Sequence, residues 1–64
     1  MSKNTDAFDR LCGHCAGIAL ADITVDDVRE QCSFYGASEE ATLQAIAGLI
    51  EYQARAILDG EVGE

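Results

Sequence analysis

The feature that most constrains this chain is a long helical pattern between residues 38 and 59. Apolar residues recur there every three or four positions, and no proline interrupts them. Ser38 is a suitable N-cap, the two glutamates that follow it suit the first turn, and Gly60 is the expected stop. A helix of about 20 residues is roughly 30 Å long, so most of the remaining chain must cover it. The apolar residues form two adjacent stripes: Leu43, Ile46, Ile50, Ala54 and Ile57 in one, and Ala45, Leu49, Tyr52 and Ala56 in the other.

Two shorter helices are expected before it, over residues 5–21 and 24–35. The first has an apolar stripe on a 3.6-residue period and two glycines, Gly13 and Gly17, that weaken its interior. The second starts with a capping box, because Thr24 is a good N-cap and Asp27 lies three residues later. Gly36 is its expected C′ residue. The stripes are Phe8, Leu11, Cys12, Cys15, Ile18 and Ala19 in the first helix, and Val25, Val28, Cys32 and Tyr35 in the second.

These patterns predict an all-α fold, a compact three-helix domain in which two shorter helices pack on a long C-terminal helix. The 64 residues allow a single domain. Two short helices cover only one broad side of the long one, so apolar surface is left over and favours a homodimer. We expect Leu49, Tyr52 and Ala56 to form that interface.

Three cysteines and the single histidine form the one cluster with the residue types of a metal site. Cys12, His14, Cys15 and Cys32 would supply a Cys₃His set for structural zinc, provided that the helix breaks at Gly13. The tetrapeptide at residues 12–15 also occurs in disulfide isomerases, but there it needs a thioredoxin fold, which this chain is too short to form. The interpretation we prefer is three free thiols that act as small buried hydrophobic groups, with the tetrapeptide in the middle of the first helix, and no cofactor.

The acidic residues are unevenly distributed. The chain has 12 acids and 4 bases, a net charge of −8, and six of the acids fall between residues 22 and 40 with Arg29 as the base among them. So acidic a chain is not expected to bind nucleic acid directly, because that requires clustered lysine and arginine. An acidic face instead attracts a basic partner. The residues expected to contact that partner are Asp22, Asp26, Asp27, Glu30, Phe34, Glu39 and Glu40.

In size, acidity and helical composition the chain resembles the small DNA-mimic inhibitors that phages use against restriction and CRISPR systems. The resemblance implies a protein that blocks a basic, nucleic-acid-binding surface on another protein. Two alternatives stay open, a structural zinc-binding module and a dimeric helical adaptor. An adaptor would use the apolar surplus on its long helix, and its charge would serve only solubility.

Several function classes are not expected. The chain has no glycine-rich phosphate loop and no arrangement typical of a hydrolase, so we expect no enzyme activity. It also lacks an apolar run long enough for a secretory signal or a membrane span, and an odd number of cysteines fits a reducing environment. The expectation is therefore a cytoplasmic protein with no membrane role.

Overall fold

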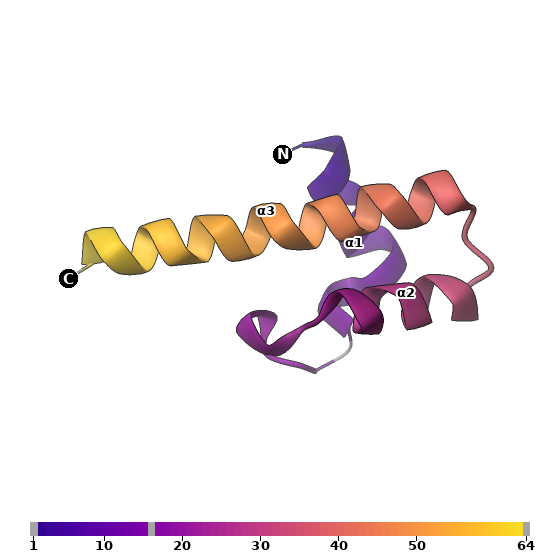
Figure 1. Ribbon diagram of the computed structural model, residues 1–64, viewed down its shortest axis with the longest axis horizontal. Helices are drawn as coiled ribbons and strands as arrows, with labels where there is room; N and C mark the ends of the chain where they lie inside the picture. Colours follow the sequence, from indigo (N-terminus) through magenta and orange to yellow (C-terminus); the bar gives the residue numbers. More distant parts are fainter. Residues whose placement is uncertain (1, 16, 64) are drawn as a thin grey trace.

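The computed structural model describes residues 2–15 and 17–63, and the side chains of His14 and residues 61–63 lie outside that description. Its helices are α1 (Lys3–Cys12), α2 (Val25–Phe34) and α3 (Glu39–Gly63), with single 3-10 turns η1 (Gly13–Cys15) and η2 (Leu20–Asp22). Figure 1 shows α3 along the whole length of the molecule, with α1 crossing it steeply and α2 beside its first half. The expected all-α architecture, with two shorter helices on a long C-terminal helix, is confirmed. No helix in the described ranges is long and apolar enough to cross a bilayer.

The expected helix over residues 5–21 is wrong at both ends. It begins earlier because Ser2 is the N-cap, and its Oγ accepts a hydrogen bond from the Thr5 N–H at 3.2 Å. It ends at Cys12 because Gly13 adopts the left-handed conformation (φ +51°) and donates its N–H to the Asp9 carbonyl. Gly13 is therefore a C-cap and not a weak interior position.

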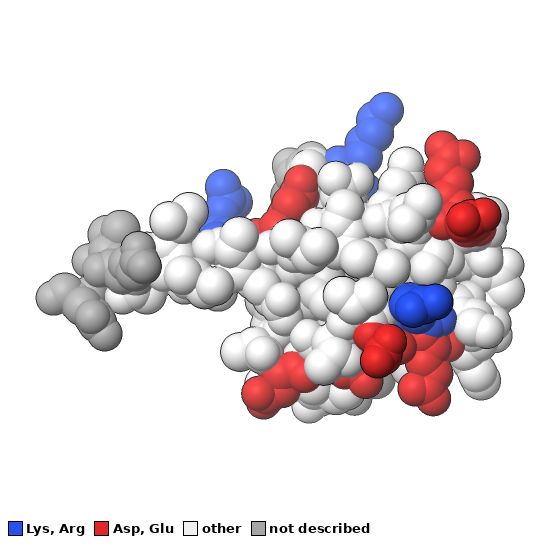
Figure 2. Space-filling model, in the orientation of Figure 1, with Lys and Arg blue, Asp and Glu red and all other residues white. Residues whose placement is uncertain are grey.

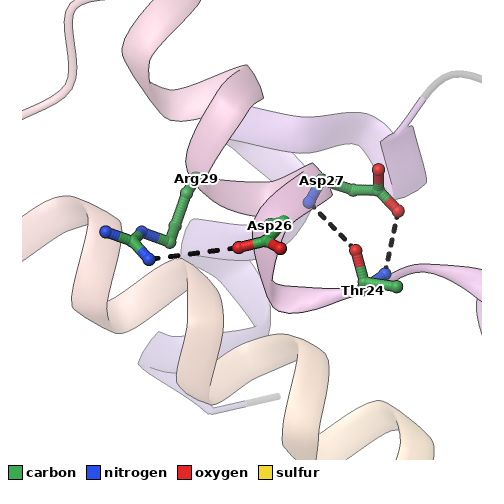
Figure 3. A network of polar contacts seen from close by, with 4 residues as sticks. All are labelled: Thr24, Asp26, Asp27 and Arg29. Atoms are coloured by element: carbon green, nitrogen blue, oxygen red, sulfur yellow. Dashed lines mark hydrogen bonds and ion pairs between the residues drawn. The ribbon is translucent and has the colours of Figure 1, made fainter.

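The start of α2 agrees with the sequence. The Asp27 N–H donates to Thr24 Oγ1 at 3.2 Å, and the Thr24 N–H donates to Asp27 Oδ2 at 2.9 Å (Figure 3). Ile23 and Val28 on either side are both buried in the core, as expected of a hydrophobic staple. The predicted capping box is thus confirmed in both of its hydrogen bonds.

The end of α2 is a Schellman motif. Gly36 takes φ +68°, its N–H donates to the Ser33 carbonyl at 3.1 Å, and the Ala37 N–H donates to the Cys32 carbonyl at 2.9 Å. The expected C′ glycine is confirmed. This tight end turns the chain back so that α3 begins close to α2.

The start of α3 is also as expected, but its end is not. Ser38 Oγ accepts a hydrogen bond from the Ala41 N–H at 3.2 Å, which confirms the N-cap. The helix then continues through Gly60 to Gly63, so the predicted stop at Gly60 is wrong. A glycine ends a helix where the chain turns to positive φ, and Gly60 does not adopt such a φ.

The core lies where all three helices meet. Ile18, Ala19, Val25 and Tyr35 were expected in apolar stripes facing it but are exposed. Ile18 and Ala19 lie beyond the early end of α1, and Val25 and Tyr35 lie at the two ends of α2. The buried apolar residues of the cluster are Phe8, Cys12, Cys15, Ile23, Val28, Cys32, Ala45 and Leu49.

The crossing of α1 and α3 depends on one glycine. A Cβ built on Gly48 would stand 2.1 Å from the Asn4 carbonyl oxygen and 2.8 Å from the Phe8 Cβ, so only glycine fits there. Ser2 Oγ and Asn4 Nδ2 donate hydrogen bonds to the Glu51 carboxylate beside this contact. The close backbone approach determines which side of α3 faces the core.

Candidate functional site

The outward face of α2 carries two acids and an aromatic side chain in one line. Asp26, Glu30 and Phe34 are spaced four residues apart, which places them on one side of the helix. That side is opposite to the buried Val28 and Cys32. All three are exposed, and Phe34 is 80% exposed. The structure thus brings together three of the seven residues expected to bind a partner.

Asp27 lies on the same helix but has a structural role. One of its carboxylate oxygens accepts the Thr24 N–H in the capping box (Figure 3), and the residue is half-buried. Removing or reversing this charge would therefore affect the start of α2 as well as any partner. Substitutions of Asp26 and Glu30, which do not form this cap, therefore test partner binding without disturbing the cap at the start of α2.

One base lies among the acids of α2. Arg29 Nη1 is 4.0 Å from Asp26 Oδ1, and both side chains are more than half exposed (Figure 3). An exposed pair at this distance contributes little to stability. Asp26 therefore remains available to a basic surface on another protein.

The remaining expected contact residues extend the acidic surface at both ends of α2. Asp22 is exposed in η2 just before the helix, and Glu39 and Glu40 are exposed in the first turn of α3 just after it. Figure 2 shows acidic side chains over α2 and around the start of α3, with a basic side chain among them. We define the acidic face as Asp22, Asp26, Asp27, Glu30, Glu39 and Glu40.

Sequence reasoning missed Tyr35 as a surface residue. Its ring packs edge-on against the Phe34 ring, with 5.1 Å between centroids and 90° between planes. Tyr35 was placed in the core stripe, but it follows the last residue of α2 and is exposed. We call these two rings, which lie beside the acidic face, the aromatic pair. The sequence signal for it was two adjacent aromatic residues just before the glycine that ends the helix.

The three cysteines are free thiols in the core, as preferred, but Cys12 and Cys15 do not lie in the middle of a helix. Cys12 ends α1, while Cys15 belongs to η1 and has φ +50°. Burial, with smaller contributions from Cys32 and Cys15, raises the pKa of Cys12 to about 12. Burial also raises the pKa of Cys15, and the Asp27 carboxylate adds to that effect. Protonated thiols are poor nucleophiles and poor metal ligands.

The zinc hypothesis requires His14 beside these thiols, and the His14 side chain lies outside the described residues. The chain does break at Gly13, which was the condition for a four-residue site. Among the side chains that the structure describes, no group of three or more histidines, cysteines and carboxylates is arranged to hold a metal ion. These residues therefore give no positive support to a metal centre.

The interface expected on the long helix falls mostly inside the molecule. Leu49 is 1% exposed in the core. Tyr52 packs on Phe8, with ring centroids 5.6 Å apart, and its hydroxyl donates to Asp9 Oδ2 at 2.7 Å. Only Ala56 of the three residues is exposed. A second copy of the folded chain cannot contact the buried Leu49, so these three residues cannot form an interface together.

Comparison of the chain with protein-family models, with curated proteins and with solved structures gave no match. Function is therefore inferred from the surface chemistry of the chain itself.

Proposed function

We propose that the chain is a small acidic binding protein that occupies a basic, nucleic-acid-binding surface of a partner protein and blocks it. The observation that carries this proposal is the line of Asp26, Glu30 and Phe34 on the exposed side of α2. Little in the fold requires these residues. Asp26 has only its weak pair with Arg29, and the Phe34 ring meets only the exposed Tyr35 ring among the contacts described.

The charge pattern suits a surface that otherwise binds phosphates. Carboxylates four residues apart on a helix are separated by about 6 Å along its axis. The phosphates of one DNA strand are spaced about 3.4 Å along the duplex axis. The carboxylates of the acidic face are therefore spaced more widely than the phosphates but also carry negative charge along a helix. The net charge of −8 would speed the encounter with a basic partner.

The aromatic pair, Phe34 and Tyr35, adds apolar contact area that the carboxylates do not provide. Aromatic side chains are enriched in the desolvated centres of protein interfaces. Phe34 and Tyr35 stand next to the acids without covering them, so they could enter an apolar pocket while the carboxylates meet lysines and arginines around it. The three free thiols in the core are compatible with the reducing cytoplasm that this function implies.

The test compares two charge reversals with the same net charge. Glu30→Lys changes the acidic face and Asp59→Lys changes an exposed acid near the far end of α3, so both variants carry −6. Each is immobilised and used to capture proteins from a lysate of the source cell at low and at high salt. Captured proteins are identified by mass spectrometry, and dissociation constants are then measured with the purified partner.

We expect a nucleic-acid-binding protein to be retained by wild type and by Asp59→Lys, and to be released by salt or by competing DNA. Glu30→Lys should weaken binding at least about tenfold and reduce its salt dependence. Phe34→Ala should weaken binding without changing the salt dependence. Equal capture by Glu30→Lys and Asp59→Lys, or retention that resists both salt and DNA, would contradict the proposal.

A further inference from the structure

Large apolar side chains recur on α3 every seven residues on a side that no other helix covers. Leu43, Ile50 and Ile57 are 60%, 56% and 64% exposed. Residues seven apart lie on nearly the same side of a helix, and Ala47 and Ala54 fall between them on that side. We call these five residues the outer stripe. Four of these residues belong to the first of the two stripes visible in the sequence. Ile46 of that stripe is left out because it packs on the core, and Ala47 is added.

The outer stripe lies away from the core. Ala45 and Leu49, which point to α1 and α2, are 0% and 1% exposed. Figure 1 shows that the second half of α3 extends beyond the other helices, and Figure 2 shows a mostly uncharged surface along the visible side of this projection. The apolar surface therefore continues past the end of the packed domain.

The chain exposes more surface than a folded monomer of its size should. Its accessible surface is 4472 Å² for a mass of 6.8 kDa. A compact monomer of that mass exposes about 3,950 Å², so the excess is about 500 Å² per chain. Covering this excess on two copies would bury about 1,000 Å² in total, which is the size at which a specific interface becomes plausible.

The shape of the outer stripe favours a second copy as its occupant. Large residues alternate with alanines at the spacing of a two-helix seam. When two such helices run antiparallel, the large residue of one faces an alanine of the other, and the surfaces interlock. In a parallel pair large residues would face each other, and the alanines would leave gaps.

Charge does not decide between the two orientations. Glu39 and Glu40 lie at the start of α3, and Asp59, Glu61 and Glu64 follow in the sequence near its end, so acids of the two copies come close in either orientation. The alternation of large residues and alanines is therefore the argument for the antiparallel pair. We propose that the outer stripe joins two copies of this chain through an antiparallel contact between their α3 helices.

The proposal is tested by the mass of the protein in solution, measured by sedimentation between about 1 and about 500 µM, the range in which a small interface assembles. Wild type should reach twice 6.8 kDa, and high salt should preserve the dimer because salt screens the repulsion between two acidic chains. Ile50→Lys should raise the dissociation constant at least about 100-fold. Phe34→Lys, the same kind of change at an exposed apolar position on α2, should not affect the mass.

Orientation is tested by a second charge in the same chain. In an antiparallel pair Ile50 faces Ala54 or Ala47 of the other copy, depending on the register, so Ile50→Lys/Ala54→Glu or Ile50→Lys/Ala47→Glu should dimerise more tightly than Ile50→Lys alone. A wild type that stays monomeric at the highest concentration would overturn the proposal, as would a dimer that Phe34→Lys dissociates and Ile50→Lys does not. If neither double variant dimerises more tightly than Ile50→Lys alone, the antiparallel arrangement is overturned.

Discussion

The two halves of α3 consist of similar residues but have different surroundings. In the packed half, residues 39–53, Ala45 and Leu49 are buried, and Gln53 Nε2 donates to the carbonyls of Leu20 at 3.2 Å and Ile23 at 2.8 Å. In the free half, residues 54–60, every side chain is exposed. Helical periodicity therefore predicts that a helix forms and not how much of it the chain covers.

The difference follows from the lengths of the helices. At about 1.5 Å per residue, the ten residues of α1 and of α2 each extend about 15 Å, and the 25 residues of α3 extend about 37 Å. Gly13 ends α1 well before residue 21, where the sequence predicted its end. Because α1 also crosses α3 steeply (Figure 1), it covers only a short part of the length of α3.

Gly48 and Gly60, one in each half of α3, give the largest contrast between the halves. Gly48→Ala would place a methyl group 2.1 Å from backbone, and since backbone cannot move aside easily, we expect a loss of about 3 kcal/mol or more. A domain of this size has only about 3–5 kcal/mol to lose, so the variant should be largely unfolded. Gly60 has nothing within 4 Å, and Gly60→Ala should stabilise the helix by up to about 1 kcal/mol. Urea denaturation followed by circular dichroism measures the free energy of unfolding of both variants. Equal changes from Gly48→Ala and Gly60→Ala would contradict the difference between the two halves of α3.

Two leucines provide the next contrast. Leu49→Ala removes a fully buried side chain and should cost about 2–5 kcal/mol. Leu58→Ala, at a position 61% exposed, should cost less than about 0.5 kcal/mol in dilute protein. Thermal unfolding at low concentration keeps any dimer from contributing. A large loss from Leu58→Ala would show that the free half is covered within a single chain.

The ends of α3 give the smallest contrast. Ser38→Ala should cost about 1 kcal/mol, because Ser38 Oγ accepts the Ala41 N–H at the start of the helix. Asp59→Ala should gain about 0.3–1 kcal/mol, since an acid near the C-terminal end opposes the helix dipole and the last turn has no base. Denaturation in low salt shows the effect of Asp59→Ala best. A loss of stability from Asp59→Ala would mean that its carboxylate has a partner in the fold.

Local signals allowed α2 to be predicted almost to the residue. The capping box at Thr24 and the glycine at position 36 both act through hydrogen bonds within a few residues, so the sequence shows them directly. Gly13 carried less information, because a glycine in a helical pattern can be an interior residue or a C-cap. Only the backbone conformation distinguishes the two.

Both stripes of α3 were visible in the sequence, but the one facing the core could not be chosen from hydropathy. Gly48 determines which stripe faces the core, because it lies on the side of Ala45 and Leu49 and allows α1 to approach closely there. The exposure of the acids could be predicted from their charge. The second role of Asp27 as a cap and the exposed position of Tyr35 beside Phe34 depend on where α2 ends.

Hydrogen exchange of the α3 amides, measured at several protein concentrations, tests most directly whether the two halves are held by different partners. We predict slow exchange in residues 43–53 at every concentration, because one side of this segment, with Ala45 and Leu49, is buried against the rest of the same chain. Residues 54–60 should exchange fast in dilute protein and become protected as the dimer forms, and Ile50→Lys should abolish that protection. Slow exchange of residues 54–60 in dilute protein, or fast exchange at every concentration, would contradict this account of α3.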